Sequence, residues 1–208
     1  MRTAAVFGTT GLIGSHLVQL LSQHKDYQKV LSFARRKAES LPNKVEHIDF
    51  NPESISIPNG IDDVFICLGT TMKNAGSKEA FLKVDYEMVV EIAKQAKISN
   101  VKRIVVVSSL GAEPESNNFY LQTKGKMEEA VKQFEFEYCG IVRPSLLLGN
   151  RKEFRFGEKI AIVLFKIFSF IFVGPIKNYK GIYAEDVAKS MIMLAQNGKG
   201  IITVESII

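Results

Sequence analysis

The sequence predicts an α/β protein with a doubly wound parallel sheet of six to seven strands and helices on both faces. Segments of strand periodicity alternate with segments of helical periodicity along the chain, which is typical of βαβ units. A group of glycines at residues 8–14 lies between the first strand and the first helix. The valine-rich run at 103–107 suits a strand buried on both faces, as found inside a parallel sheet.

Each expected strand is a short apolar or alternating run. In chain order these runs are residues 3–7, 29–34, 45–50, 63–68, 103–107, 138–142 and 201–205. Helices are expected where apolar side chains recur every three or four residues, and a further helix is expected over 119–134. The positions that mark the first two helices are Ile13, Leu17, Leu20 and Leu21, then Phe81, Val84, Met88, Ile92 and Ala96.

Length and composition indicate one globular domain over residues 1–208, with 150–208 expected to supply the substrate side. Hydrophobic residues make up 46% and charged residues 24%, so a disordered or collagen-like chain is excluded. The most hydrophobic stretch, 160–173, contains Lys166 and is too short to span a bilayer. It predicts a buried helix or, as a weaker alternative, a helix that lies on a membrane surface or a partner.

The cysteines, histidines and net charge exclude several classes of site. Cys67 and Cys139 lie in apolar runs, which indicates buried thiols in a reducing compartment, and we expect a cytoplasmic protein. The three histidines share no metal-ligand spacing, so no metal site is expected. The net charge of +5 includes no block of five like charges, and nucleic-acid binding is not expected.

The glycines at 8–14 follow the spacing G-x-x-G-x-x-G at the first strand-to-helix junction. Gly8 is expected to make the turn, Gly11 to allow close approach of a pyrophosphate, and Gly14 to pack the helix on the strand. The N-terminus of the helix would supply unpaired N–H groups and a positive dipole. An ordinary glycine turn is the alternative, but the position favours a dinucleotide site on a Rossmann-type sheet.

The end of the second strand favours NADP over NAD. NAD-binding proteins usually place a carboxylate there for the ribose hydroxyls, whereas this chain has Arg35 and Arg36. Two guanidinium groups suit a 2′-phosphate, although a solvated basic turn has the same composition. Asp49 and Phe50, at the end of the third strand, are expected near the adenine, or as an ordinary turn.

Tyr120 and Lys124 are the candidate catalytic pair. A spacing of four residues places them on one face of a helix, where an ammonium group would favour the phenolate of the tyrosine. Lysine can also bind the nicotinamide ribose. Ser108 and Ser109 end the preceding strand, and one of them, with Ser109 preferred, would bind the substrate oxygen. Such a pair is common by chance, and its order after the glycine loop is what favours catalysis.

These residues resemble the atypical branch of the short-chain dehydrogenase/reductase superfamily, and most closely its Tat-interactive oxidoreductase family. The resemblance covers residues 3 to about 155 well and the last fifty residues loosely. The motifs that carry it are Arg35-Arg36-Lys37, Cys67-Leu68-Gly69-Thr70-Thr71, Ala75-Gly76, Lys83-Val84-Asp85, Ser108-Ser109, Tyr120-Leu121-Gln122 with Lys124-Gly125, and Arg143-Pro144. Residues 183–188 are similar to a structural helix start of extended relatives.

The resemblance implies that NADP(H) is the cofactor and that Tyr120 takes the position of the active-site tyrosine. The implied cofactor contacts, together with those expected from the glycine loop and the loop after the fourth strand, are Gly8, Thr10, Gly11, Leu12, Ile13, Gly14, Arg35, Arg36, Leu68, Gly69, Thr70, Lys124, Leu147 and Arg155. Leu12 and Ile13 replace a more polar pair of the family, which matters little if the backbone makes those contacts.

Two functions are compatible with this pattern. The first is an NADPH-dependent reductase of a small carbonyl substrate, in which Tyr120 donates the proton and Lys124 lowers its pKa. The second is a non-catalytic NADP(H)-binding scaffold or redox sensor that acts through a protein partner. The phenylalanines of residues 154–172 would line an apolar substrate pocket or, as we prefer, pack a helix on the sheet.

Overall fold

Seven parallel strands form one sheet, which confirms the predicted fold class. The computed structural model describes residues 1–37, 40–145, 147–148 and 181–204. The strand order is β3-β2-β1-β4-β5-β6-β9. The strands are β1 (Arg2–Phe7), β2 (Tyr27–Ala34), β3 (Val45–Asp49), β4 (Asp63–Ile66), β5 (Arg103–Val107), β6 (Tyr138–Val142) and β9 (Gly200–Val204). All seven predicted strand segments are therefore strands, with ends that differ by at most two residues.

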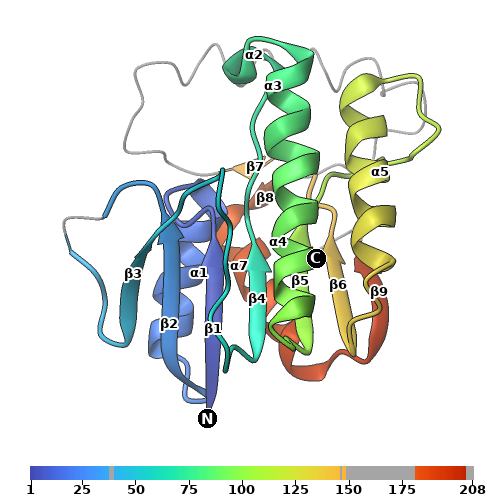
Figure 1. Ribbon diagram of the computed structural model, residues 1–208. Coiled ribbons are helices and arrows are strands. Elements are labelled where there is room, and N and C mark those ends of the chain that lie inside the picture. Colours follow the sequence, from blue (N-terminus) through green and yellow to red (C-terminus); the bar gives the residue numbers. More distant parts are fainter. Residues whose placement is uncertain (38–39, 146, 149–180, 205–208) are drawn as a thin grey trace.

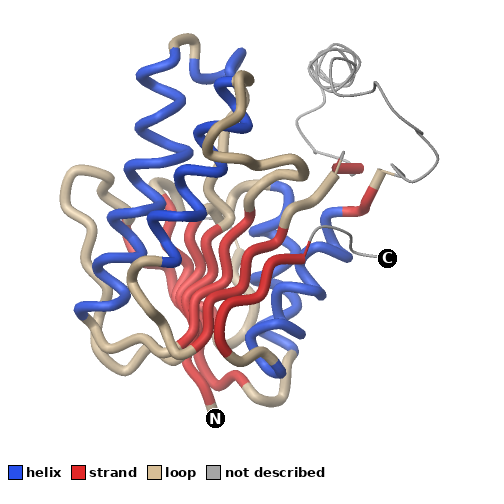
Figure 2. The backbone as a smooth tube through the Cα atoms, turned by 90° about the vertical axis from the view of Figure 1, so that its right-hand side faces the viewer, coloured by secondary structure: helices blue, strands red, loops and turns tan. Residues whose placement is uncertain are grey.

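The helices cover both faces of this sheet (Figures 1 and 2). Helices α4 and α5 lie side by side on one face, and α1 and α7 lie together on the other. The helical elements are α1 (Leu12–Gln23), α2 (Met72–Ala75), α3 (Lys78–Leu82), the π-helix η1 (Lys83–Glu87), α4 (Met88–Ile98), α5 (Phe119–Lys132) and α7 (Ala184–Asn197). Three layers result, with the sheet in the middle.

Each face of the sheet has its own apolar core. Under α4 and α5, side chains such as Ile92 and Met127 pack against Ile66 and Ile104 from the central strands. Under α1 and α7, a second cluster packs against the opposite side of the same strands, through Leu17 among others. Burial on both faces explains why the central strands are apolar at nearly every position.

Three short features differ from the sequence-based expectation. The strands β7 (Leu147–Leu148) and β8 (Ile182–Tyr183) form a separate parallel pair. The short helix α2 follows β4, with the Thr71 hydroxyl accepting a hydrogen bond from the Asn74 N–H at 3.1 Å. The expected helix ending near residue 98 is interrupted by the π turn of η1. Within the described part of the chain, no helix has the length and apolar character needed to cross a membrane.

Candidate nucleotide-binding and catalytic site

The chain changes direction across the sheet between β1 and β4. It runs outward from β1 through β2 and β3, then crosses back to β4 on the other side of β1. Loops at the carboxyl ends of β1 and β4 therefore leave in opposite directions, and ligands of open α/β sheets bind at such a switch point. The loops that begin with Gly8 and Cys67 meet there, since a Cβ atom on Gly8 would lie 2.7 Å from the carbonyl carbon of Cys67.

The three glycines of the first loop have different geometries. Gly8 has a φ of +82°, in the left-handed region, and its neighbour Cys67 leaves no room for a side chain. A Cβ atom on Gly14 would lie 2.2 Å from the carbonyl oxygen of Gly8, so α1 packs directly against the loop. A Cβ atom on Gly11 would meet the Gly8 oxygen at 3.2 Å and otherwise largely open space. Of the three glycines, Gly11 thus has the most room beside it, while its own N–H donates to the carbonyl oxygen of Gly8 at 3.0 Å.

The N-terminus of α1 keeps its first N–H groups unpaired by any side chain. Gly11 provides no capping side chain, and the first turn contains no acidic residue. These N–H groups and the helix dipole together favour an anion at this end. Thr10 is exposed and Leu12 is half-buried, whereas the Ile13 side chain is buried in the core, so only its backbone faces the loop.

Arg35 and Arg36 follow β2 directly and are both exposed. The end of β2 is connected to the glycine loop by a buried hydrogen bond of 2.9 Å, which Ser32 donates to the Thr9 hydroxyl oxygen. Arg35 and Arg36 and the start of the uncapped helix therefore lie at the same edge of the sheet. This arrangement can accept an anionic group at both places.

Asp49 and Phe50 lie at the same edge, where β3 ends. The Phe50 N–H donates to the carbonyl oxygen of Ala34 at 3.1 Å, and its ring lies edge-on to Phe7 with centroids 5.6 Å apart. The Asp49 carboxylate is exposed and lies 3.0 Å from Nε2 of His47. Phe50 is thus held against the core, while Asp49 faces solvent.

The loop after β4 brings Leu68, Gly69 and Thr70 to the other side of the switch point. Leu68 is half-buried against the core, and Gly69 is exposed. The Thr70 N–H donates to Oδ2 of Asp85 at 2.8 Å. A Cβ atom on Gly69 would lie 3.4 Å from Asp85 Oδ1 and 3.7 Å from Lys124 Nζ, so this glycine lies directly beside both groups.

Lys124 is buried, and its ammonium pairs with a buried carboxylate. Its Nζ atom lies 2.6 Å from Oδ1 of Asp85. Burial by itself lowers the pKa of Lys124, but the attraction of Asp85, with Tyr120 and Glu128, outweighs burial and raises this pKa above its usual value. Lys124 therefore carries a positive charge at neutral pH.

Tyr120 lies one turn before Lys124, in the first turn of α5. Asn118 caps this helix, and its Oδ1 atom accepts hydrogen bonds from the N–H groups of Tyr120 at 3.0 Å and Leu121 at 3.3 Å. The Tyr120 side chain is half-buried, and its ring centroid lies 5.5 Å from that of Phe81. The phenol is therefore positioned by its helix cap and by one ring contact.

Both serines at the end of β5 are buried. Ser108 has no hydrogen-bond partner for its hydroxyl among the described residues, and its N–H donates to the carbonyl oxygen of Val142 at 2.7 Å. The Ser109 hydroxyl makes one long contact of 3.4 Å, to the carbonyl oxygen of Leu110. A buried hydroxyl without a partner is costly, which makes Ser108 a candidate for ligand contact beside the expected Ser109.

Two expected cofactor contacts and the phenylalanine-rich segment lie at or beyond the edge of the described residues. Leu147 belongs to β7, and it is partly buried against the cluster under α1 and α7. Arg155 and the residues 154–173 lie outside the described residues.

Two residues of this site had no role assigned from the sequence. Asp85 was part of a family-like motif, but its burial beside Lys124 was not foreseen. Gly125 lets the loop after β5 cross α5, because a Cβ atom there would lie 2.3 Å from the carbonyl carbon of Glu113. The sequence offered one signal for Asp85: it is an acidic residue in an amphipathic helix, between Val84 and Tyr86.

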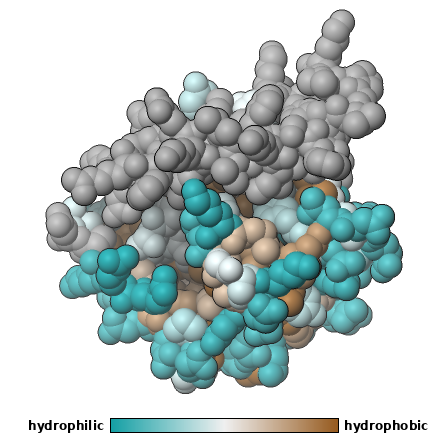
Figure 3. Space-filling view, turned by 90° about the horizontal axis from the view of Figure 1, so that it is seen from above, coloured by the Kyte–Doolittle hydropathy of each residue, from teal (hydrophilic) through white to brown (hydrophobic). Residues whose placement is uncertain are grey.

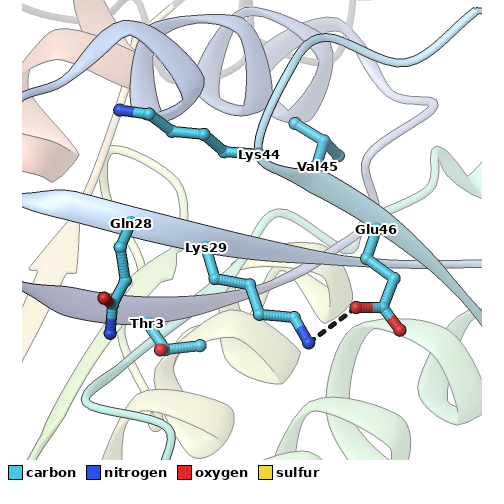
Figure 4. A pocket seen from close by; sticks show the side chains of 6 residues that line it. All are labelled: Thr3, Gln28, Lys29, Lys44, Val45 and Glu46. Atoms are coloured by element: carbon cyan, nitrogen blue, oxygen red, sulfur yellow. Dashed lines mark ion pairs between the residues drawn. The ribbon is translucent and has the colours of Figure 1, made fainter.

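A separate hollow lies at the opposite end of the sheet. It has a volume of about 440 Å³ and is bordered by residues at the amino ends of β1, β2 and β3, among them Gln28, Lys44 and the ion pair of Lys29 with Glu46 at 2.6 Å (Figure 4). Ligands of this fold bind at the carboxyl ends, so we do not assign the cofactor to this hollow.

Seen from above (Figure 3), the surface shows hydrophobic residues between hydrophilic ones.

Comparisons with known proteins agree with a nucleotide-binding site. The sequence pattern of the family described as NAD(P)H-binding matches residues 8–160. Among curated proteins, the chain is 32% identical over 207 residues to "Protein FMP52, mitochondrial" of Lodderomyces elongisporus, covering 93% of this chain and 86% of that protein. The protein of the same name from Meyerozyma guilliermondii is 36% identical over 199 residues, covering 92% of this chain and 84% of that protein.

Solved structures with low sequence identity share the fold. MoeE5, solved in complex with UDP-glucose and NAD, has a TM-score of 0.72 at 17% identity and covers 98% of this chain and 76% of its own. A putative NAD-dependent epimerase/dehydratase from Bacillus halodurans has a TM-score of 0.72 at 18% identity, covering 98% of this chain and 92% of its own. The likeness shows that the chain has a Rossmann-type fold.

The expected cytoplasmic location is wrong by this comparison, because the relatives are named as mitochondrial proteins. Buried, reduced thiols were the basis of that expectation, and they do not distinguish one reducing compartment from another. The family assignment rests on the match to residues 8–160 and on identities above 30% that extend over most of both chains. The chain belongs to the NAD(P)H-binding family and is a relative of the fungal FMP52 proteins.

Proposed function

We propose that the protein is an NADPH-dependent oxidoreductase that reduces a small carbonyl substrate. The observation that supports this proposal best is the placement of Lys124. Its buried ammonium lies beside Gly69 at the switch point of the sheet, one helical turn from Tyr120. A lysine so placed can reach both a ribose bound at the switch point and a phenol that donates a proton.

The residues at the switch point fit a dinucleotide. Gly11 has no side chain and leaves space beside the loop, and the first turn of α1 offers N–H groups to a pyrophosphate. Arg35 and Arg36 offer several donors to a 2′-phosphate at the end of β2. When bound, the nicotinamide of NADPH supplies a hydride.

The catalytic residues would divide the remaining work. Tyr120 holds the proton that the substrate oxygen takes up, and Ser108 or Ser109 binds that oxygen and orients it. Lys124 binds the ribose hydroxyls and places its positive charge near the phenol oxygen. The Asn118 cap fixes the start of α5 and with it the position of Tyr120.

The cofactor preference is tested by the variant Arg35→Ala/Arg36→Ala. Charge-assisted hydrogen bonds contribute roughly 1.5–3 kcal/mol each, so the loss of both arginines should weaken NADPH binding by at least about tenfold. NADH lacks the 2′-phosphate, and its affinity should hardly change. Titration calorimetry with both cofactors measures this difference.

A matched control removes two other exposed positive charges, in the variant Lys25→Ala/Lys126→Ala. It lowers the net charge equally, so it separates the 2′-phosphate contact from general electrostatic attraction. Equal losses of NADPH affinity in the two double variants, or equal losses for NADPH and NADH in the arginine variant, would contradict the proposed preference.

A further inference from the structure

The ion pair between Asp85 and Lys124 is almost completely removed from water. The two side chains are 0% and 4% exposed, and Nζ lies 2.6 Å from Oδ1. Removing two charges from water costs several kcal/mol for each ion, and a close partner offsets this cost without making the pair a strong source of stability. A function that needs the charge is therefore a better explanation for this pair than stability alone.

Asp85 connects three segments of the site. Its Oδ1 atom pairs with Lys124 of α5, and its Oδ2 atom accepts the N–H of Thr70, from the loop after β4, at 2.8 Å. Asp85 itself belongs to η1, which packs against α5. The carboxylate thus fixes the ammonium relative to the loop at the switch point.

The π turn and Gly69 place the buried pair directly beneath an exposed position of the backbone. A π turn contains an extra residue relative to an α-helix and occurs often at functional sites. Gly69 is exposed, and a Cβ atom on it would lie in contact with Asp85 Oδ1 at 3.4 Å and 3.7 Å from Lys124 Nζ. Because glycine has no side chain, a ligand above this position can come close to the ammonium.

We propose that Asp85 is a positioning residue that keeps Lys124 charged and directed toward the cofactor side of the loop at Gly69 and Thr70. This inference rests on the proposed function, in which Lys124 binds the cofactor. Asp85 itself acts through Lys124 and through the Thr70 N–H. Its removal should therefore change the charge state of Lys124 as well as the affinity for the cofactor.

The charge of Lys124 depends on few neighbours among the described residues. Asp85 faces it from η1, Tyr120 and Glu128 face it from α5, and the loop after β4 contributes backbone at Gly69. Glu128 is itself paired with Arg143 at 2.7 Å, so it compensates Lys124 only weakly. Without Asp85, burial would dominate and lower the pKa of Lys124 toward the neutral range.

The variant Asp85→Asn tests this inference through the pH dependence of NADPH binding. Between pH 7 and pH 9, wild-type affinity should stay nearly constant, since Lys124 remains charged and the 2′-phosphate has already ionised near pH 6. In the variant, affinity should fall with rising pH, by about tenfold for each unit above the lowered pKa of Lys124. Glu87→Gln is the control, because it removes an exposed carboxylate from the same π turn.

A direct titration of Lys124 separates this inference from the proposed function. NMR of the lysine Cε–H signals in the cofactor-free protein, with Lys124→Met for assignment, reports the charge of Lys124 whether or not NADPH binds. A Lys124 signal in Asp85→Asn that stays protonated through pH 9 would overturn the inference. So would an affinity loss that is the same at every pH. Wild-type protein without NADPH affinity would instead contradict the proposed function.

A second variant covers the case in which Asp85→Asn does not fold. The double variant Asp85→Asn/Lys124→Met removes both charges, so it should recover the melting temperature that the single variant loses. NADPH affinity should remain low in it, because the ammonium is gone. If the double variant, like the single variant, does not fold, Asp85 is needed for the fold alone, and the inference is overturned.

Discussion

The side chain of Tyr120 lies one helical turn from a charged group, as a reacting group would, and its position is fixed by contacts with its neighbours. Its helix is capped two residues earlier by Asn118, its ring lies against Phe81, and Lys124 follows on the next turn. The side chain is only partly buried, so part of it stays accessible. A hydroxyl in such a place can be removed without changing the ring packing, which makes it a sharp test at the scale of one residue.

Tyr120→Phe should abolish most turnover and leave NADPH affinity unchanged. The ring keeps its contact with Phe81, whereas the proton donor is lost, and general acid catalysis contributes about 10²–10⁴-fold. NADPH oxidation followed at 340 nm with ketones, aldehydes and quinones measures the loss, beside calorimetric affinity.

Tyr86→Phe is the matched control, since Tyr86 is also half-buried but belongs to η1. Wild-type turnover in Tyr120→Phe on an accepted substrate would contradict the catalytic role. A wild type that binds NADPH but does not oxidise it with any of the substrates tested would favour the alternative, an NADP(H)-dependent sensor.

At the scale of elements, the junction of β1, the glycine loop and α1 combines a packing constraint with an open binding surface. A Cβ atom on Gly14 would clash with the loop backbone, whereas one on Gly11 would meet only two carbonyl oxygens, at 3.2 and 4.0 Å. The same residue type thus serves the fold at one position and the ligand at another. Substitutions at the two positions should separate these roles.

Gly14→Ala should destabilise the protein, and Gly11→Val should chiefly abolish cofactor binding. A methyl group on Gly14 would lie 2.2 Å from the Gly8 oxygen, and overpacking of this kind costs about 1–3 kcal/mol. Gly11 has an ordinary φ of −76°, so valine fits the backbone and costs about 1 kcal/mol or less as a helix cap. Urea unfolding and NADPH titration of each variant measure the two effects. Comparable stability losses with retained binding in Gly11→Val would contradict the assignment of the loop.

The elements that could be predicted from the sequence are those with a repeated pattern. Seven strands and the helices α1, α4 and α5 follow from apolar periodicity, which needs several residues to be recognised, whereas for α7 only the start was expected, from a resemblance. The two-residue strands β7 and β8 and the four-residue α2 are too short for that. The π turn has the composition of an ordinary helix, because its extra residue changes the backbone rather than the apolar pattern.

The segments that form the candidate site were predictable to a similar degree, for a related reason. The glycines and the arginine pair can be interpreted from the local sequence alone, and the structure brings their segments to one edge of the sheet. Asp85 cannot be interpreted in this way, because a carboxylate in a helix normally indicates a face exposed to solvent. Its burial depends on Lys124, which lies far along the chain, and such a pairing exists only in the folded protein.

For the whole molecule, the buried groups on strand β6, which lies next to the edge strand β9, set a limit to stability at alkaline pH. Burial raises the pKa of the Cys139 thiol to about 11, and burial likewise raises the pKa of Tyr138 to about 12. Both side chains are only 1% exposed. In the unfolded chain these groups release their protons at lower pH, so alkaline conditions favour unfolding.

The free energy of unfolding should therefore fall by about 2 kcal/mol between pH 8 and pH 10 through Cys139 alone. The sign follows from the raised pKa of the folded thiol: its contribution is complete below the unfolded pKa of about 8.5 and is lost as pH rises toward about 11. Urea unfolding of the wild type and Cys139→Ala at pH 8, 9 and 10 measures this. The variant should be less stable at pH 8 and lose less with pH; parallel profiles would contradict the prediction.

The π turn of η1 has a consequence for how the length of this chain can vary. Each residue rotates a helix by about 100°, so deletion of the exposed Glu87 would let the turn close as a regular α-helix. The helix would survive, but Asp85 would swing away from α5 relative to α4. A relative one residue shorter at this point would therefore keep the fold, while its lysine equivalent to Lys124 faced no carboxylate. In the evolution of such proteins, the loss of a single codon here would keep the fold but remove the partner of the charge on which the proposed chemistry depends.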